Sequence, residues 1–125
     1  MNYISLIDAI KIHDTIIENY WGLEWIKDKW QLDSLLSHIQ NDDYYSNIIE
    51  KISHLFFWLI QFHMFNDWNK RTSIIITSFF LDINNIIIDD YVIKMEDLAI
   101  WVAKWEIGKE DLNKIFKSMF LSFWY

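Results

Sequence analysis

The segment spanning residues 48–63 most narrowly constrains the fold of this chain. Its apolar side chains recur at the three- and four-residue spacing of a single helix face, and its C-terminal half is apolar nearly all round. A helix with such a surface has to be covered by other elements on most of its sides. The most apolar stretches, residues 55–65 and 74–81, contain Gln, His, Thr or Ser and are shorter than the roughly 18 to 20 residues of a membrane span. They therefore predict buried helices.

The same spacing of apolar residues predicts further helices along nearly the whole chain. Ser5 and Asp8 form a capping box at the start of the first helix, and Gly22 follows its end. With two Gly and no Pro, the chain has few other boundary signals. Further helices are expected around residues 32–39, 72–84, 95–102 and 112–120, with Asn84 and Asn85 ending one of them and a short extended piece at 86–88. We predict one all-α domain, residues 1–125, built as a bundle of about six helices.

Composition excludes several classes of protein. The chain has 125 residues, is 53% hydrophobic and contains 8 Trp, which is too much apolar surface for a disordered chain. Its net charge of −7 argues against nonspecific binding of nucleic acid, which needs a basic surface. Without Cys there is no disulfide, thiolate zinc site or Cys nucleophile. The N-terminus has no secretion signal, and we expect a cytoplasmic protein that uses neither membrane nor nucleic acid.

A polar run, HMFNDWNKRT at residues 63–72, separates the two most apolar predicted helices. The start of the second helix offers unpaired backbone N–H groups and a positive dipole end, to which Lys70 and Arg71 add full charges. Asp67 beside them would repel phosphate unless a divalent cation bridges the two. His63 could accept a proton from a hydroxyl that attacks phosphate. The pattern indicates a site for a nucleotide with Mg²⁺.

This run resembles the Fic/Doc (Fido) signature H-x-F-x-[DN]-x-N-K-R-T, and specifically its Doc branch. Residues 21–23, 28 and 32–34 resemble the glycine-leucine turn and the following helix of the family, and residues 80–85 resemble its F-L-x-x-N-G segment. The resemblance implies a six-helix fold in which the motif loop joins two central helices. It also implies an N-terminal flap that clamps the target segment.

The resemblance carries roles over to individual residues. His63 matches the catalytic base and Asp67 the metal-coordinating acid. The residues expected to bind the nucleotide are Asn66, Asn69, Lys70 and Arg71. The implied cofactors are ATP and Mg²⁺.

The residue at position 70 differs between the two branches of the family, which catalyse different reactions. The AMP-transferring branch has Gly at this position, which leaves room for the distal phosphates, whereas the Doc branch has Lys and is understood to transfer the γ-phosphate from a reversed nucleotide. The resemblance therefore implies a toxin that phosphorylates a Thr of elongation factor Tu and stops translation. A small antitoxin partner would restrain it, and we expect that partner to dock near residues 21–30.

Two alternatives to phosphotransfer remain open. One of them is AMP transfer to a protein hydroxyl. Trp68 stands where the family usually has Gly or Ala, and a bulky residue there could block the phosphate loop and leave an inactive binding module.

Each site residue also has an ordinary structural interpretation. His63 could be a hydrogen-bonded core histidine, Asp67 or Asn69 could cap the next helix, and Lys70 could be a surface charge. Arg71 is harder to explain in this way, because it is the only Arg in a chain that otherwise uses Lys.

Other polar residues predict no further site. The remaining histidines lack metal-ligand spacing and are expected in structural or solvent-facing roles: His13, His38 and His54. The paired acids are expected to be solvated loop residues: Asp42, Asp43, Asp89 and Asp90.

Overall fold

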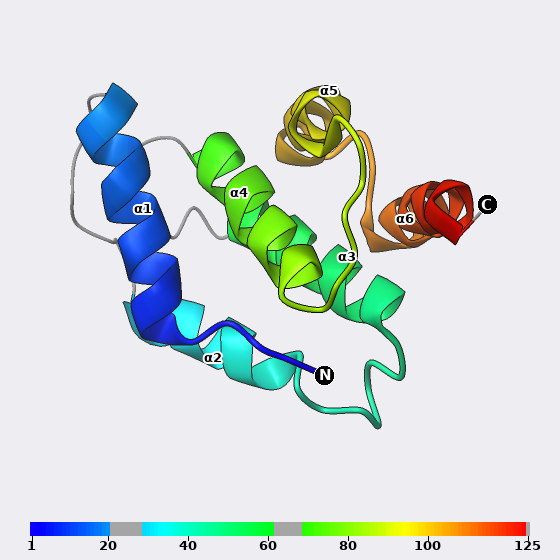
Figure 1. Cartoon of the computed structure of the whole chain (residues 1–125), viewed down its shortest axis with the longest axis horizontal. Helices are drawn as coiled ribbons and strands as arrows, with labels where there is room; N and C mark the ends of the chain where they lie inside the picture. The colour runs from blue at the N-terminus through cyan, green and yellow to red at the C-terminus, as the bar shows by residue number, and fades with distance from the viewer. Residues whose placement is uncertain (21–28, 62–68, 125) are drawn as a thin grey trace.

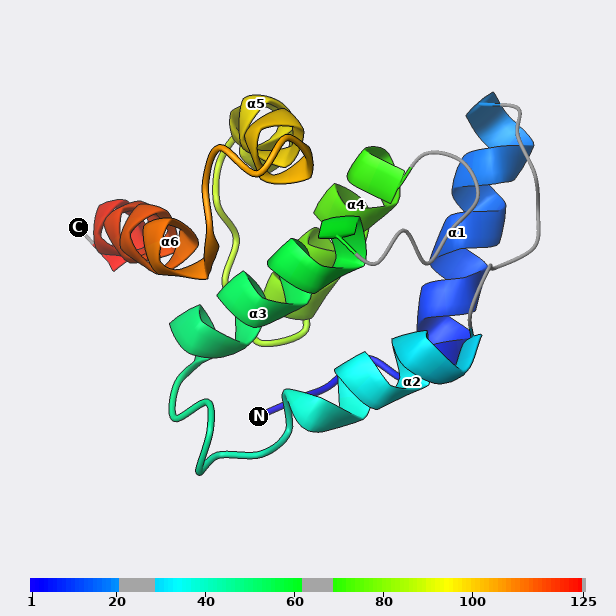
Figure 2. The same cartoon turned by 180° about the vertical axis from the view of Figure 1, so that it is seen from behind.

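The computed structural model describes residues 1–20, 29–61 and 69–124 (Figures 1 and 2). These residues form α1 (Leu6–Tyr20), α2 (Lys29–His38), α3 (Ile48–Gln61), α4 (Asn69–Asp82), α5 (Tyr91–Ala103) and α6 (Lys109–Trp124). The predicted all-α bundle of about six helices is confirmed. Residues 86–88, where a short extended piece was expected, form no strand and belong to the connection between α4 and α5.

Helix α3 lies at the centre of the bundle. It packs against α2, α4, α5 and α6, while α4 also packs against α1 and α5. The two views show α3 and α4 side by side, with α1 and α2 on one flank and α5 and α6 on the other (Figures 1 and 2). No helix within the described ranges is long and apolar enough to cross a membrane.

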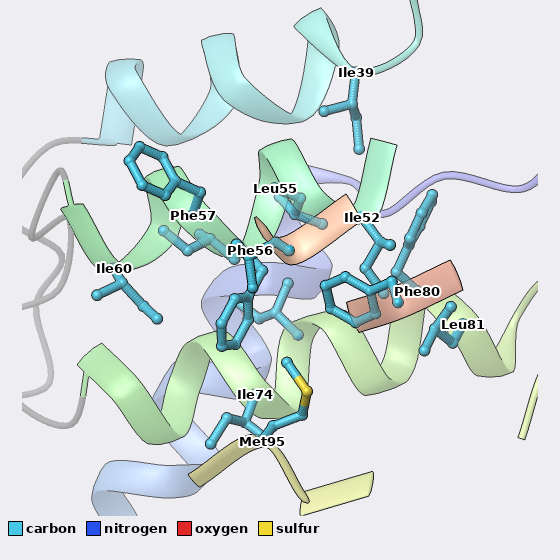
Figure 3. Close-up of a cluster of buried hydrophobic side chains, with 14 of the residues drawn as sticks. Ile39, Ile52, Leu55, Phe56, Phe57, Ile60, Ile74, Phe80, Leu81 and Met95 are labelled. Carbon is cyan, nitrogen blue, oxygen red and sulfur yellow. The ribbon is translucent and has the colours of Figure 1, made fainter. Parts of the chain in front are cut away.

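The core is built mainly between α3 and α4 (Figure 3). Leu55 and Phe56 of α3 and Phe80 of α4 are completely buried, and Met95 of α5 closes the same cluster. Phe56 also meets Phe116 of α6 edge to face, with ring centres 6.2 Å apart. Burial of a large apolar side chain contributes roughly 1.5 to 3 kcal/mol, so this cluster holds the central helices together.

Local signals set the ends of two helices as predicted. The amide of Asp8 donates to Ser5 Oγ at 3.1 Å, and the amide of Ser5 donates back to the Asp8 carboxylate at 3.4 Å. This reciprocal pair is the expected capping box of α1. After α4, Asn85 has a left-handed φ of 63°. The following amide, of Ile86, donates to the carbonyl of Leu81 at 2.9 Å, which ends the helix.

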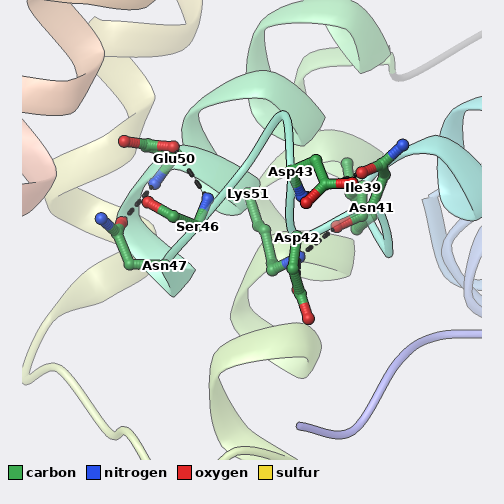
Figure 4. Close-up of polar contacts among 8 residues, drawn as sticks. All are labelled: Ile39, Asn41, Asp42, Asp43, Ser46, Asn47, Glu50 and Lys51. Atoms are coloured by element: carbon green, nitrogen blue, oxygen red, sulfur yellow. Dashed lines mark hydrogen bonds and ion pairs between the residues drawn. The ribbon is translucent and has the colours of Figure 1, made fainter.

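A buried lysine joins α3 to the connection that precedes it (Figure 4). The side chain of Lys51 is 1% exposed, and its Nζ donates to the Ile39 carbonyl at 2.6 Å and to Asp42 Oδ1 at 2.8 Å. Asp42 is exposed, as expected, but it is also ion-paired, which the sequence did not predict. The hydrogen bond from Lys51 lowers the pKa of Asp42. Burial opposes the charge of Lys51, but hydrogen bonds with Asp42 and Tyr3 outweigh it and raise the Lys51 pKa.

His38 and His54 meet in an aromatic cluster beside α3. Their ring centres lie 5.5 Å apart, and the Tyr45 hydroxyl lies 3.1 Å from Nδ1 of His54. The ring of Trp58 contacts His54 from the other side, at 6.3 Å. Burial, followed by the charge of Lys109 and then His38, lowers the pKa of His54 to about 4. His54 is therefore a neutral structural residue at pH 7, which agrees with the expected structural role.

Replacing Lys51 by Met should destabilise the fold, because the Ile39 carbonyl would lose its buried donor. An unpaired buried polar group costs about 1 to 3 kcal/mol. Urea unfolding at pH 7 measures the loss. The exposed Lys11→Met serves as the matched control and should shift stability by less than about 0.5 kcal/mol. The two variants unfolding at the same urea concentration would contradict the structural role of Lys51.

Acid should weaken the fold through His54. The unfolded chain takes up a proton below the ordinary pKa of 6.5, whereas the folded chain keeps His54 neutral down to about 4, so stability falls as pH drops between these values. Between pH 7 and pH 4.5 we expect a loss of about 1 to 3 kcal/mol from this group. Urea unfolding of the parent and of His54→Asn at both pH values tests this. An equal acid loss in both proteins would exclude His54 as the cause.

Candidate functional site

The polar motif occupies the junction of the two central helices. Helix α3 ends at Gln61 and α4 begins at Asn69, so the segment between them connects the core helices as the sequence predicted. The motif residues placed before α4 lie outside the described residues: His63, Asn66, Asp67 and Trp68. Their roles stay predictions. Most of the expected flap and antitoxin-docking region, residues 21–30, also lies outside the described residues. Its last two residues, Lys29 and Trp30, begin α2 and are exposed.

The start of α4 is electrically positive. The helix has 14 residues and no acidic side chain in its first turn, where the positive end of its dipole lies. Asn69 is its first residue, followed by Lys70, which is exposed, and Arg71, which is half-buried. Backbone N–H groups at such an end lack helical acceptors. Together with two cationic side chains they form a surface that can bind an anion such as phosphate.

Buried polar residues follow this surface along α4. Thr72 and Ser73 are fully buried directly after the two cations. One turn further, Thr77 Oγ1 lies 2.8 Å from the Ser73 carbonyl and 2.6 Å from the Tyr91 hydroxyl of α5. Burial raises the pKa of Tyr91, so its hydroxyl remains protonated and able to bond. The bond between Thr77 and Tyr91 therefore joins the middle of α4 to the start of α5.

A hydrogen bond also joins the end of α3, on the other side of the motif, to α5. Gln61, the last residue of α3, donates through Nε2 to the carbonyl of Val102 in α5. The end of α3 is therefore tied to α5 by Gln61, and the middle of α4 is tied to it by Thr77 with Tyr91. These two bonds were not predicted from the sequence. Their signal was present, because Gln61 and Thr77 are polar residues inside the two most apolar stretches.

The described residues contain part of the predicted site. Asn69, Lys70 and Arg71 lie together in the first turn of α4, which begins three residues before the predicted start at Thr72. Across residues 1–20, 29–61 and 69–124, no group of three or more His, Asp or Glu side chains could hold a metal ion. The expected metal residue, Asp67, falls in one of the gaps between these ranges.

Comparison with known proteins agrees with this arrangement. The model of the Fic/DOC family matches residues 3–81, which include the motif and most of α1 to α4. Protein kinase doc of Escherichia phage P1 is 29% identical over 111 residues, covering 86% of this chain and 87% of that protein. Since the family match spans more than half of the chain, the protein belongs to the Fic/DOC family.

Proposed function

We propose that this protein is a Doc-like toxin that transfers the γ-phosphate of ATP to a protein hydroxyl. The observation that carries the proposal is Lys70, an exposed cation in the first turn of α4. AMP-transferring members of the family have Gly there, so Lys70 favours the Doc reaction. Similarity to a protein named a kinase supports the same reaction. The target is a Thr of a translation factor such as elongation factor Tu, whose modification arrests translation.

The roles of the motif residues follow from phosphate chemistry. Mg²⁺ bound with ATP would neutralise part of the phosphate charge, and Asp67 is the residue to hold it. Asn66 and Asn69 help to hold the nucleotide. Lys70 and Arg71, with the N–H groups at the start of α4, stabilise the remaining negative charge.

His63 moves the proton in the transfer. The oxygen of the target Thr attacks the γ-phosphorus, His63 takes the hydroxyl proton, and the bond between the γ-phosphorus and ADP breaks. ADP leaves with the electron pair of that bond. The proton on His63 then passes to solvent, and the base is ready for another cycle.

An antitoxin partner completes the proposed system. A toxin that modifies a translation factor needs restraint in the cell that makes it, so a small antitoxin protein would bind the chain. Because the proposed target is a translation factor, the toxin would act in the cytoplasm. The acidic net charge of −7 suits protein partners better than nucleic acid.

Transfer with ATP labelled at the γ- or the α-phosphate tests the reaction on purified elongation factor Tu. We expect only the γ label on the target, and mass analysis should find one phosphoryl group on a Thr. His63→Ala should slow transfer by roughly 10²- to 10⁴-fold because the general base is lost. The exposed His38→Ala is the matched control and should transfer at the parent rate.

Two results would overturn the phosphotransfer proposal. Incorporation of the α label would assign AMP transfer. Incorporation of neither label would leave a binding module, and a gain of transfer in Trp68→Ala would then show that the Trp68 indole blocks the site.

Arg71→Lys should weaken ATP binding although it keeps the charge. Lys cannot reproduce the two parallel bonds of a guanidinium to phosphate. Loss of one charge-assisted hydrogen bond costs about 1.5 to 3 kcal/mol, so calorimetry should show affinity falling by about tenfold or more. Lys117→Ala, an exposed site on α6, should bind ATP like the parent. Equal affinities of Arg71→Lys and the parent would remove Arg71 from the nucleotide site.

A further inference from the structure

A polar hollow of about 380 Å³ lies between the first halves of α3 and α6. Its lining includes Tyr45, Glu50, Ser53, Lys109, Glu110 and Asn113. Ser53 precedes the last residue of α3, Gln61, by about 12 Å of helix. The hollow is therefore separate from the junction where the motif lies, and its chemistry is independent of phosphotransfer.

Two polar atoms of this lining have no hydrogen-bond partner among the described residues. They are Oγ of Ser53 and Oδ1 of Asn113, and both atoms are buried. Ser53 is 1% exposed, within the most buried stretch of α3. Leaving a buried polar atom unpaired is unfavourable, so such atoms in a native fold call for a partner. Oδ1 of Asn113 is an acceptor, and it therefore needs a donor.

The charges of the lining also call for a donor. Glu50 and Glu110 contribute two carboxylates, against one ammonium from Lys109. That ammonium lies over the ring of Trp58, 5.7 Å from its centre, and so already has a partner. One carboxylate oxygen of Glu50 accepts from the amide of Ser46 at 3.0 Å, which leaves its other oxygen for a further donor (Figure 4). Carboxylates thus outnumber ammonium groups around the hollow.

We propose that this hollow binds a small molecule through a primary ammonium group. Such a group carries three N–H donors and a positive charge, which match Oδ1 of Asn113, Oγ of Ser53 and a nearby carboxylate. The rings of Tyr44 and Tyr45 on the same lining can add cation–π attraction. A free amino acid and a linear amine both carry this group.

Calorimetry on the purified protein tests the proposal with three probes that share the same 1,5-diaminopentane chain. Cadaverine has the ammonium groups alone, L-lysine adds a carboxylate, and N,N′-diacetylcadaverine has no ammonium. We expect binding of cadaverine, of L-lysine or of both, and none of the diacetyl compound. Tighter binding of L-lysine would identify an amino-acid site in which Lys109 meets the carboxylate, and tighter binding of cadaverine an amine site.

Variants that remove the unpaired atoms show whether these atoms bind a ligand or serve only the packing of the helices. Asn113→Leu and Ser53→Ala should each weaken binding by about tenfold or more, while the urea midpoint without ligand stays unchanged or rises. The exposed Ser37→Ala on α2 is the matched control and should bind like the parent.

Three results would overturn the proposal. The first is no binding of either ammonium probe, and the second is equal binding of the diacetyl compound. The third is a fall in stability with unchanged affinity in both variants, because Ser53 and Asn113 would then serve packing alone.

Discussion

Burial of α3 on most of its sides is the constraint on which the rest of the structure depends. Four other helices cover it, so nearly every position from 51 to 60 faces protein. A polar side chain in such a helix needs a partner, and those found here also join α3 to its neighbours. Lys51 binds the connection before the helix and Gln61 binds α5. These bonds fix the orientation of α3, and with it the position from which the chain enters the motif.

The packing of α4 on α3 determines where the candidate active site lies. Its apolar residues pack on α3, so its first turn has to lie beside the end of that helix. The positive end of the helix, which has no acidic side chain in its first turn and carries Lys70 and Arg71, therefore lies beside the end of α3. Thr77 and Tyr91 join the middle of the same helix to α5. The backbone donors of the first turn are already oriented by the helix, so they need no reorganisation when phosphate charge develops.

The sequence predicts what depends on near neighbours. Helix positions, the Ser5 capping box and the end of α4 at Asn85 were all confirmed, since each is encoded within a few residues. What depends on distant contacts was not predicted, including the pairing of Lys51 with Asp42 and the meeting of His38 with His54. The run of Ile at 86–88 forms no strand, since a strand needs another strand to pair with. Of the site, the structure shows Asn69, Lys70 and Arg71 in the first turn of α4, and their roles in binding a nucleotide stay predictions.

The family match ends at residue 81, yet the helices that carry the motif are held by elements beyond it. Val102 and Tyr91 of α5 bind Gln61 and Thr77, and Phe116 of α6 packs on the middle of α3. These inward contacts tie α5 and α6 to the function of the motif. The hollow beside Asn113 lies between the first halves of α3 and α6. Ser53 in its lining is about 12 Å of helix away from the end of α3, so a second task there need not disturb the motif.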